Sequence, residues 1–269
     1  MRLHPNWHIL LPSSTPSIYL EARVYLPPAR QSAEDSTVPA ITHSFLCSST
    51  SSTAVRIDDV SSDVLQQMRS WGVRRLITAA HPWQKLGGNL LDPVISQCLT
   101  AAIYDNAQTG TALVTFNARG VGQSGGSMGI FGLNTVPGEK DFAAVERFAV
   151  DLFKPEEIRR FGYSWGSVPA LNAPSATPVR SILLVSPPST LFTLTTMFSS
   201  RTFKKALESV NDVTIIYGTK DQFTGVGAFE SLARRGEVTC RVVDGADHFY
   251  RDSTSARQLV GEMWRWHEK

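Results

Sequence analysis

The chain has 269 residues, of which 42% are hydrophobic and 19% charged, a composition that excludes a disordered protein. Its formal net charge of +2 gives no electrostatic reason to expect nucleic acid or an acidic membrane surface as a partner. No run approaches the roughly 18 apolar residues that span a bilayer, and the apolar stretch from Ile9 to Leu11 is too short for a secretion signal. We therefore expect a soluble, cytoplasmic protein.

Three cysteines, Cys47, Cys98 and Cys240, lie far apart in the sequence. Their odd number and the lack of Cys-x-x-Cys spacing argue against a disulfide framework and against a thiolate zinc site. We expect free thiols and no bound metal.

The N-terminal part of the chain predicts one strand, one insertion and one helix. Residues 18–26 are rich in β-branched and aromatic side chains and end at a Pro-Pro pair, which is typical of a strand. The Ser/Thr-rich residues that follow predict a surface insertion at about 29–59, with a short strand at about 40–46. Apolar residues at helical spacing between Val60 and Trp71 predict an amphipathic helix.

From residue 74 onward, strand and helix patterns alternate. The predicted strands lie at 74–80, at 111–117, in a short segment ending at Phe161 or Gly162, at 181–186, at 213–218 and at 238–243. The predicted helices lie at about 93–105, at 140–153, from about Trp165, at 228–235 and at 256–267. This alternation predicts an α/β fold with a mostly parallel central sheet flanked by helices. With no internal repeat and no linker, we expect a single domain over residues 1–269.

Residues 162–166, Gly-Tyr-Ser-Trp-Gly, fit the pattern G-x-S-x-G between a predicted strand and a predicted helix. A tight turn there would hold the Ser164 hydroxyl out over the sheet, and the small residues Gly162 and Gly166 would let the strand and the helix approach closely. Ligands of open parallel sheets bind beyond the carboxyl ends of the strands, so this position favours Ser164 as a nucleophile.

A serine nucleophile needs a base, and the base needs a carboxylate that orients it. Asp221 and His248 each follow a predicted strand, and the two strands are successive. Both side chains should therefore reach one serine at the same end of the sheet. Of the other histidines, His8 is expected in an N-terminal tail, and only His81 also follows a predicted strand.

The turn at 81–88, His-Pro-Trp-Gln-Lys-Leu-Gly-Gly, predicts half of an oxyanion hole. Attack on an acyl carbon builds negative charge on its oxygen, which two backbone N–H groups should stabilise. We expect these donors to be Trp165, directly after the nucleophile, and Trp83, because Pro82 has no N–H. His81 precedes the serine in the chain, and we expect it to hold this turn rather than to act as the base.

Residues 120–125 spell G-x-G-x-x-G after a strand, which is also the pattern of a dinucleotide site. That site requires a helix that starts within the motif and an acidic residue at the end of a second strand. Here no helical pattern starts until after Pro137, and Glu139 and Asp141 introduce that helix. We therefore expect no cofactor.

With these turns the sequence resembles the α/β-hydrolase superfamily, and it is similar to the compact serine-hydrolase branches that include esterases and serine-aminopeptidase-like proteins. The resemblance is carried by HPWQKLGG, FNARGVGQSGGS followed by GEKDF, GYSWGS, GTKDQFT and GADHF, within about residues 74–269. The N-terminal third matches loosely, and Pro82 stands where many relatives have glycine. The resemblance implies a Ser164 nucleophile with Asp221 and His248 as its partners, and no cofactor.

The resemblance also implies that Arg119, Gly120, Gly122 and Ser124 are mainly structural. The segment at about 187–211 leaves room for only a minimal lid, which favours a fairly open acyl site. Aromatic residues that could line an apolar pocket there are Tyr163, Trp165, Trp83, Phe131, Phe192 and Phe198.

We expect a serine hydrolase that cleaves a carboxylic ester, thioester or related acyl compound through an acyl-serine intermediate. Its partner would be a small-molecule acyl substrate, with no nucleic acid and no membrane, and its oligomeric state is open. Two alternatives stay open as well. One is an acyltransferase or peptidase with the same three residues, and the other is a non-catalytic ligand-binding protein on the same fold.

Overall fold

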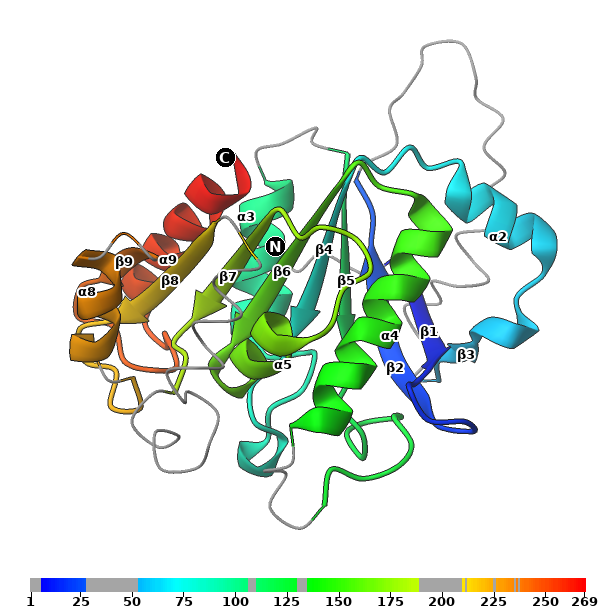
Figure 1. The fold of residues 1–269 in the computed structure, drawn as a ribbon, viewed down its shortest axis with the longest axis horizontal. Coiled ribbons are helices and arrows are strands. Elements are labelled where there is room, and N and C mark those ends of the chain that lie inside the picture. The colour runs from blue at the N-terminus through cyan, green and yellow to red at the C-terminus, as the bar shows by residue number, and fades with distance from the viewer. Residues whose placement is uncertain are drawn as a thin grey trace.

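The computed structural model describes residues 6–27, 53–105, 110–129, 135–188, 210, 212–224, 226–234, 236 and 238–269. Within these ranges nine strands form one sheet, with helices on both of its faces (Figure 1). The strands are β1 (Trp7–Pro12), β2 (Tyr19–Tyr25), β3 (Val55–Arg56), β4 (Arg75–Ala80), β5 (Thr111–Phe116), β6 (Glu157–Tyr163), β7 (Ser181–Val185), β8 (Val213–Gly218) and β9 (Thr239–Val243).

The sheet is mostly parallel, in the order β3-β1-β2-β5-β4-β6-β7-β8-β9. All pairs from β5 to β9 are parallel, and β2 pairs antiparallel with both β1 and β5. Ala80 at the end of β4 lies opposite both Phe116 and Gly162, so the carboxyl ends of these strands are level. The predicted α/β architecture is therefore confirmed, and the turns that follow the parallel strands meet at one end of the sheet.

Two cores cover the two faces of the sheet because successive strand residues point to opposite sides. Leu76 packs in the core that includes Phe142, on the face of the sheet covered by α4 and α5, whereas Ile77 packs in the core that includes Trp266, on the opposite face. The helices are α2 (Ser62–Arg69), α3 (Thr100–Tyr104), α4 (Val136–Phe153), α5 (Ser167–Asn172), α8 (Val226–Arg234) and α9 (Ser253–His267), with the short helical turns η1 (Ile57–Asp59), η2 (Gln84–Leu86), η3 (Val94–Leu99) and η4 (Ser164–Gly166).

The structure differs from the sequence predictions in β1 and at the start of α4. His8, expected in a tail, lies in β1, and that prediction is wrong. The apolar Leu10 occupies an outward, half-buried position of this strand, which blurs the alternation of polar and apolar residues that identifies a strand. Helix α4 begins at Val136, ahead of the predicted start at 140, with Pro137 in its first turn, where proline loses no helical hydrogen bond.

Most of the predicted insertion at 29–59 and of the predicted lid at 187–211 lies outside the described residues, as does the strand predicted at 40–46. The described end of the insertion, residues 53–59, forms β3 and η1. Because β3 pairs with β1, this end belongs to the sheet rather than to a surface insertion.

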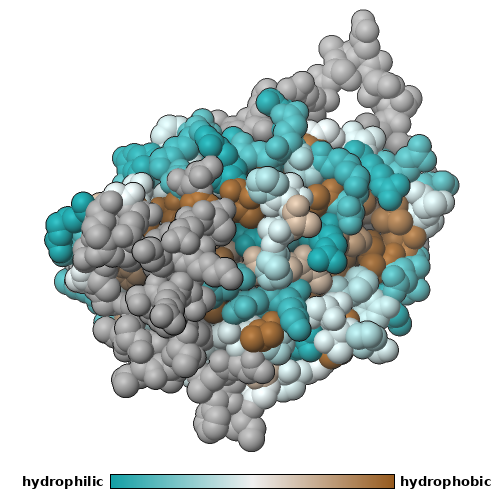
Figure 2. Space-filling view, in the orientation of Figure 1, coloured by the Kyte–Doolittle hydropathy of each residue, from teal (hydrophilic) through white to brown (hydrophobic). Residues whose placement is uncertain are grey.

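The face that carries α4 and α5 has a mixed surface (Figure 2). On its coloured part, hydrophilic and intermediate side chains surround separate hydrophobic patches, as is usual for a globular protein.

None of the helices in the described part of the chain combines the length and the apolar character that a bilayer crossing requires.

A buried carboxylate connects β2 to the turn after β5. Glu21 accepts hydrogen bonds from Asn117 Nδ2 at 2.8 Å and from the Gln123 N–H at 2.7 Å, and His8 Nε2 lies 2.7 Å from its other oxygen. Burial raises the pKa of Glu21, but these hydrogen bonds together outweigh burial and lower the pKa to about 2. The folded protein therefore stabilises the ionised form.

We expect Glu21→Gln to destabilise the protein more at neutral pH than in acid. The carboxyl has an ordinary pKa of 4.5 and a folded pKa of about 2. Ionised Glu21 therefore stabilises the fold by about 3 kcal/mol above pH 4.5. This stabilisation is lost as the pH falls toward 2. In urea unfolding, the gap between wild type and variant should shrink by roughly 2 kcal/mol from pH 7 to pH 3. The exposed Glu156→Gln is the control, and a gap independent of pH would contradict the assignment.

Candidate active site

Ser164 lies at the tight turn from β6 into α5. Its backbone has φ of +51°, in the left-handed region that side chains other than glycine rarely adopt. This is the strained conformation that a G-x-S-x-G turn imposes on its serine. The turn therefore has the shape that the sequence motif predicts.

Two glycines make this turn possible. A Cβ atom on Gly162 would come closer than 3.0 Å to backbone atoms of Gly166 and Ser167. A Cβ atom on Gly166 would come equally close to the backbone of Ala80 and His81. The turn therefore has no room for a side chain at either glycine, where the ends of β4 and β6 approach the start of α5.

His248 and Asp221 come from the turns after β9 and β8. His248 Nε2 lies 2.9 Å from Ser164 Oγ, and His248 Nδ1 lies 2.9 and 3.1 Å from the two carboxylate oxygens of Asp221. All three residues are at least nine-tenths buried. With Nδ1 donating to the carboxylate, Nε2 is left to accept the Ser164 O–H. The structure therefore joins the three predicted side chains in one chain of hydrogen bonds.

Further hydrogen bonds hold the Asp221 carboxylate. It accepts the Phe223 N–H at 2.9 Å, the Thr224 N–H at 3.1 Å and the Thr224 hydroxyl at 2.8 Å. Burial raises the pKa of Asp221, but the hydrogen bond and charge of His248, with a hydrogen bond from Ser186, lower it overall. Asp221 is therefore held as a carboxylate beside the imidazole.

Three aromatic rings surround the His248 imidazole. Tyr163 stacks on it with 5.8 Å between ring centroids, whereas Phe223 and Phe249 meet it edge to face at 4.8 and 5.3 Å. The Tyr163 hydroxyl also donates to the His248 carbonyl at 2.9 Å. These contacts restrict the imidazole to the orientation in which it reaches Ser164.

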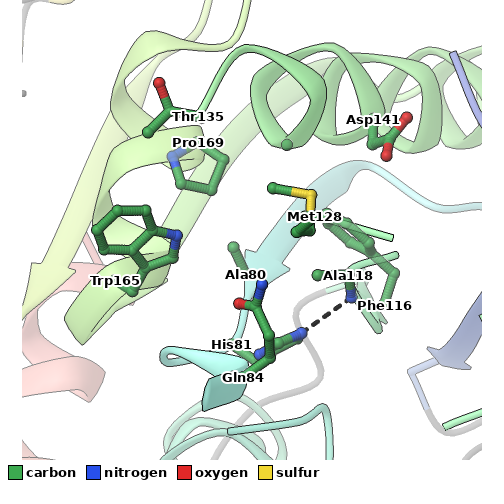
Figure 3. A pocket seen from close by; sticks show the side chains of 11 residues that line it. Ala80, His81, Gln84, Phe116, Ala118, Met128, Thr135, Asp141, Trp165 and Pro169 are labelled. Atoms are coloured by element: carbon green, nitrogen blue, oxygen red, sulfur yellow. Dashed lines mark hydrogen bonds between the residues drawn. The ribbon is translucent and has the colours of Figure 1, made fainter. Parts of the chain in front are cut away.

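His81 connects the turn after β4 to the turn after β5. Its Nε2 accepts the Ala118 N–H at 2.9 Å (Figure 3). Its Nδ1 donates to the Pro82 carbonyl at 2.6 Å. Burial is the main influence on this ring and lowers the pKa of His81 to about 4. The ring is therefore neutral at pH 7, as one donating and one accepting nitrogen require. His81 holds the turn that carries Trp83, in line with the prediction.

A cavity of about 180 Å³ opens beside Ser164 and His248. Engineered cavities of about 150 Å³ hold a benzene molecule, so this one has room for a ring-sized group. Its other described walls are Pro82, Trp83, Leu86, Gly87, Gly88, Asp92, Tyr163, Trp165, Pro188, Phe223 and Phe249. Of the aromatic residues predicted here, Phe131, Phe192 and Phe198 lie outside the described residues.

Trp83 and Trp165 lie side by side on the wall of this cavity. Their indole rings stack with 5.9 Å between centroids. The structure thus brings the two residues whose backbone N–H groups are predicted to hold an oxyanion next to Ser164. The role of those N–H groups stays a prediction.

Trp165 also lines a second, smaller cavity of about 30 Å³, together with His81, Met128 and Pro169 (Figure 3). A water molecule needs about 10–15 Å³ by this measure, so the space suits two waters. It is too small for a substrate group.

The turn at 120–125 is occupied by structural contacts. Ser124 Oγ donates to the Asn117 carbonyl at 2.8 Å and accepts the Glu21 N–H at 2.9 Å. Arg119 forms a buried ion pair with Asp141 of α4, with Nε and Oδ2 2.6 Å apart. In the described part of the chain, the helix that follows the motif is α4, which begins at Val136, so the described residues of this turn do not form the start of a dinucleotide site.

The sequence predictions missed several residues near Ser164. Phe223 and Phe249 lie within two residues of Asp221 and His248, so inspection of flanking positions could have found them. Ser186 and Tyr250 share a 2.9 Å hydrogen bond beside Asp221 and both have positive φ, which no sequence pattern indicates. Asp92 lies in the long turn between β4 and η3, where no periodicity marks it.

No protein-family model and no curated protein sequence matches the chain. Solved structures do resemble it. One is an α/β serine hydrolase homologue from Coxiella burnetii, with a TM-score of 0.66 and 18% identity over 98% of this chain and 99% of that one. Another is XC6422 from Xanthomonas campestris, a member of the α/β serine hydrolases without lid, with a TM-score of 0.64 and 18% identity over 99% and 98%.

Est1E from Butyrivibrio proteoclasticus is also similar, with a TM-score of 0.61 and 12% identity over 97% of this chain and 98% of that one. At such identities the likeness concerns the fold. The chain therefore has the α/β-hydrolase fold, as the sequence resemblance implies.

We expect Gly166→Ala to destabilise the protein by about 1–3 kcal/mol, because the new methyl group would overlap backbone atoms that cannot move aside easily. Gly261→Ala, in α9, is the matched control, since nothing lies within 4 Å of its Cβ position. That control should gain about 0.5–1 kcal/mol from higher helix propensity. Urea unfolding measures both, and equal stability of Gly166→Ala and wild type would contradict the close approach.

Proposed function

We propose that the protein is a serine hydrolase that cleaves a carboxylic ester or a related acyl compound. The observation that carries this proposal is the chain of hydrogen bonds from Ser164 through His248 to Asp221, with 2.9 Å between Oγ and Nε2, beside an open cavity. The fold shared with the α/β serine hydrolase homologue from Coxiella burnetii supports the reaction class.

In this mechanism Ser164 Oγ attacks the acyl carbon while its proton passes to His248 Nε2. Asp221 keeps Nδ1 protonated and stabilises the imidazolium that forms. The imidazolium then gives its proton to the leaving group, and the acyl group remains on Ser164. A water molecule that gives its proton to Nε2 attacks the acyl-serine, which releases the acid and restores the hydroxyl.

Each attack places negative charge on the former carbonyl oxygen. We assign the backbone N–H groups of Trp83 and Trp165 as the donors that stabilise this charge. Removal of one such donor typically lowers the rate about 10²–10³-fold. His81 would support this step indirectly, because its hydrogen bond to the Pro82 carbonyl holds the residue next to Trp83.

The cavity favours a small substrate. Its volume of about 180 Å³ and its aromatic walls suit a short acyl chain or a ring-sized alcohol better than a long lipid chain. A short p-nitrophenyl ester is therefore a suitable first substrate.

Ser164→Ala should lower kcat on p-nitrophenyl butyrate by at least about 10⁴-fold, because no other group would form the acyl-enzyme. A fluorophosphonate probe should label the wild type on Ser164 and should label neither Ser164→Ala nor His248→Ala. Ser62→Ala, an exposed position at the start of α2, is the control and should keep full activity and labelling. Full esterase activity of Ser164→Ala, with circular dichroism unchanged, would refute the nucleophile.

Asp221→Asn should lower kcat by about 10³–10⁴-fold, because an amide in place of the carboxylate no longer keeps Nδ1 protonated or stabilises the imidazolium. Asp244→Asn removes the same charge from an exposed carboxylate near the His248 turn and serves as the control. Steady-state kinetics with p-nitrophenyl butyrate measures both. Equal activity of the two variants would show that Asp221 has no role beyond folding.

A further inference from the structure

Asp92 is the only acidic residue on the described walls of the cavity beside Ser164. Its Oδ1 accepts the N–H of Val94, the first residue of η3, at 2.9 Å. Within the described ranges, no other group donates a hydrogen bond to this carboxylate, and no Lys, Arg or His forms an ion pair with it. Its second oxygen therefore has no protein partner in this part of the chain.

Burial affects the pKa of the Asp92 carboxyl more than the neighbouring groups do. Loss of water raises the pKa of Asp92, and the Val94 N–H and the nearby His248 only partly offset this. A carboxylate withdrawn from water is unfavourable unless a cation or several donors compensate it. A positively charged group in the cavity would supply the compensation that the described side chains do not.

The other walls of the cavity also suit a cation. Five aromatic residues line it, namely Trp83, Tyr163, Trp165, Phe223 and Phe249. The faces of such rings attract alkylammonium groups, and the guanidinium of Arg251 already stacks on the Phe249 ring, 4.3 Å from its centroid. Arg251 is exposed and forms no ion pair with Asp92, so it does not neutralise the carboxylate.

We propose that Asp92 is a specificity-determining residue that selects acyl substrates carrying a positively charged amine or alkylammonium group. The cation would lie between the Asp92 carboxylate and the aromatic walls while the ester carbonyl reaches Ser164. The kinetic part of this inference rests on the proposed serine hydrolase function, whereas the binding of the cation does not.

Binding alone tests the cation site. Choline and 3,3-dimethylbutan-1-ol have the same shape and differ in charge, and the fluorescence of Trp83 and Trp165 in the cavity wall should report either ligand. We expect the wild type to bind choline at least tenfold more tightly than the alcohol, and Asp92→Asn to lose this preference. The asparagine Oδ1 can keep the bond to the Val94 N–H. Asp63→Asn, which removes an exposed charge on α2, should keep the preference.

Kinetics tests the selection of substrate. The p-nitrophenyl esters of 4-(trimethylammonio)butanoate and 5,5-dimethylhexanoate have the same leaving group and nearly the same shape. We expect Asp92→Asn to lower the ratio of kcat/KM for the cationic ester to that for the neutral ester by tenfold or more. An unchanged ratio, with both esters affected equally or neither affected, would overturn the inference. Asp92 would then act on His248 or would only hold the start of η3.

The two proposals can fail separately. If the wild type hydrolyses the neutral ester through Ser164 but binds choline no better than the alcohol, the inference about Asp92 is overturned and the hydrolase proposal stands. If neither ester is cleaved and Ser164 is not labelled by a fluorophosphonate, but the choline preference depends on Asp92, the cation site stands and the hydrolase proposal fails.

Discussion

The contact between the Gly166 backbone and the carbonyl groups of Ala80 and His81 determines the geometry of this end of the sheet. It brings α5 against β4 and leaves Ser164 in a left-handed turn above the strand ends. Because β4, β5 and β6 end at the same level, the turns that carry His81, Asn117 and Ser164 then share one rim. Any atom added to Gly166 would separate these turns, so the arrangement of the candidate site depends on the absence of a side chain.

Around this rim, buried titratable groups are held in defined charge states by their neighbours. Asp221 is ionised because it accepts hydrogen bonds from His248, Phe223 and Thr224, and Glu21 is ionised through Asn117 and Gln123. His81 is neutral because burial disfavours its charged form. Asp92 differs from these groups, since one N–H is its only described donor. Asp92, which is partly exposed, is therefore less compensated by the described residues than Asp221 or Glu21.

The sequence predicts the parallel sheet because β5, β7 and β8 are nearly continuous apolar runs with sharp ends. Ser164 is predicted by the G-x-S-x-G motif rather than by β6, which carries two arginines, and Asp221 and His248 are predicted because each follows a strand at the same end of the sheet. The same reasoning fails for β1, where Leu10 breaks the alternation and the strand depends on pairing with β2. It also fails for Asp92, Ser186 and Tyr250. Their importance comes from backbone angles and from turns that meet only in three dimensions, and neither leaves a periodic signal in the chain.

The antiparallel placement of β2 between β1 and β5 has a consequence for biosynthesis. The β1–β2 hairpin emerges from the ribosome well before β5 exists to complete its pairing. Until residues 111–116 follow, one full side of β2 carries backbone groups without strand partners, and such edges are templates for association with other nascent chains. The first half of the chain is therefore the part most exposed to such association during translation.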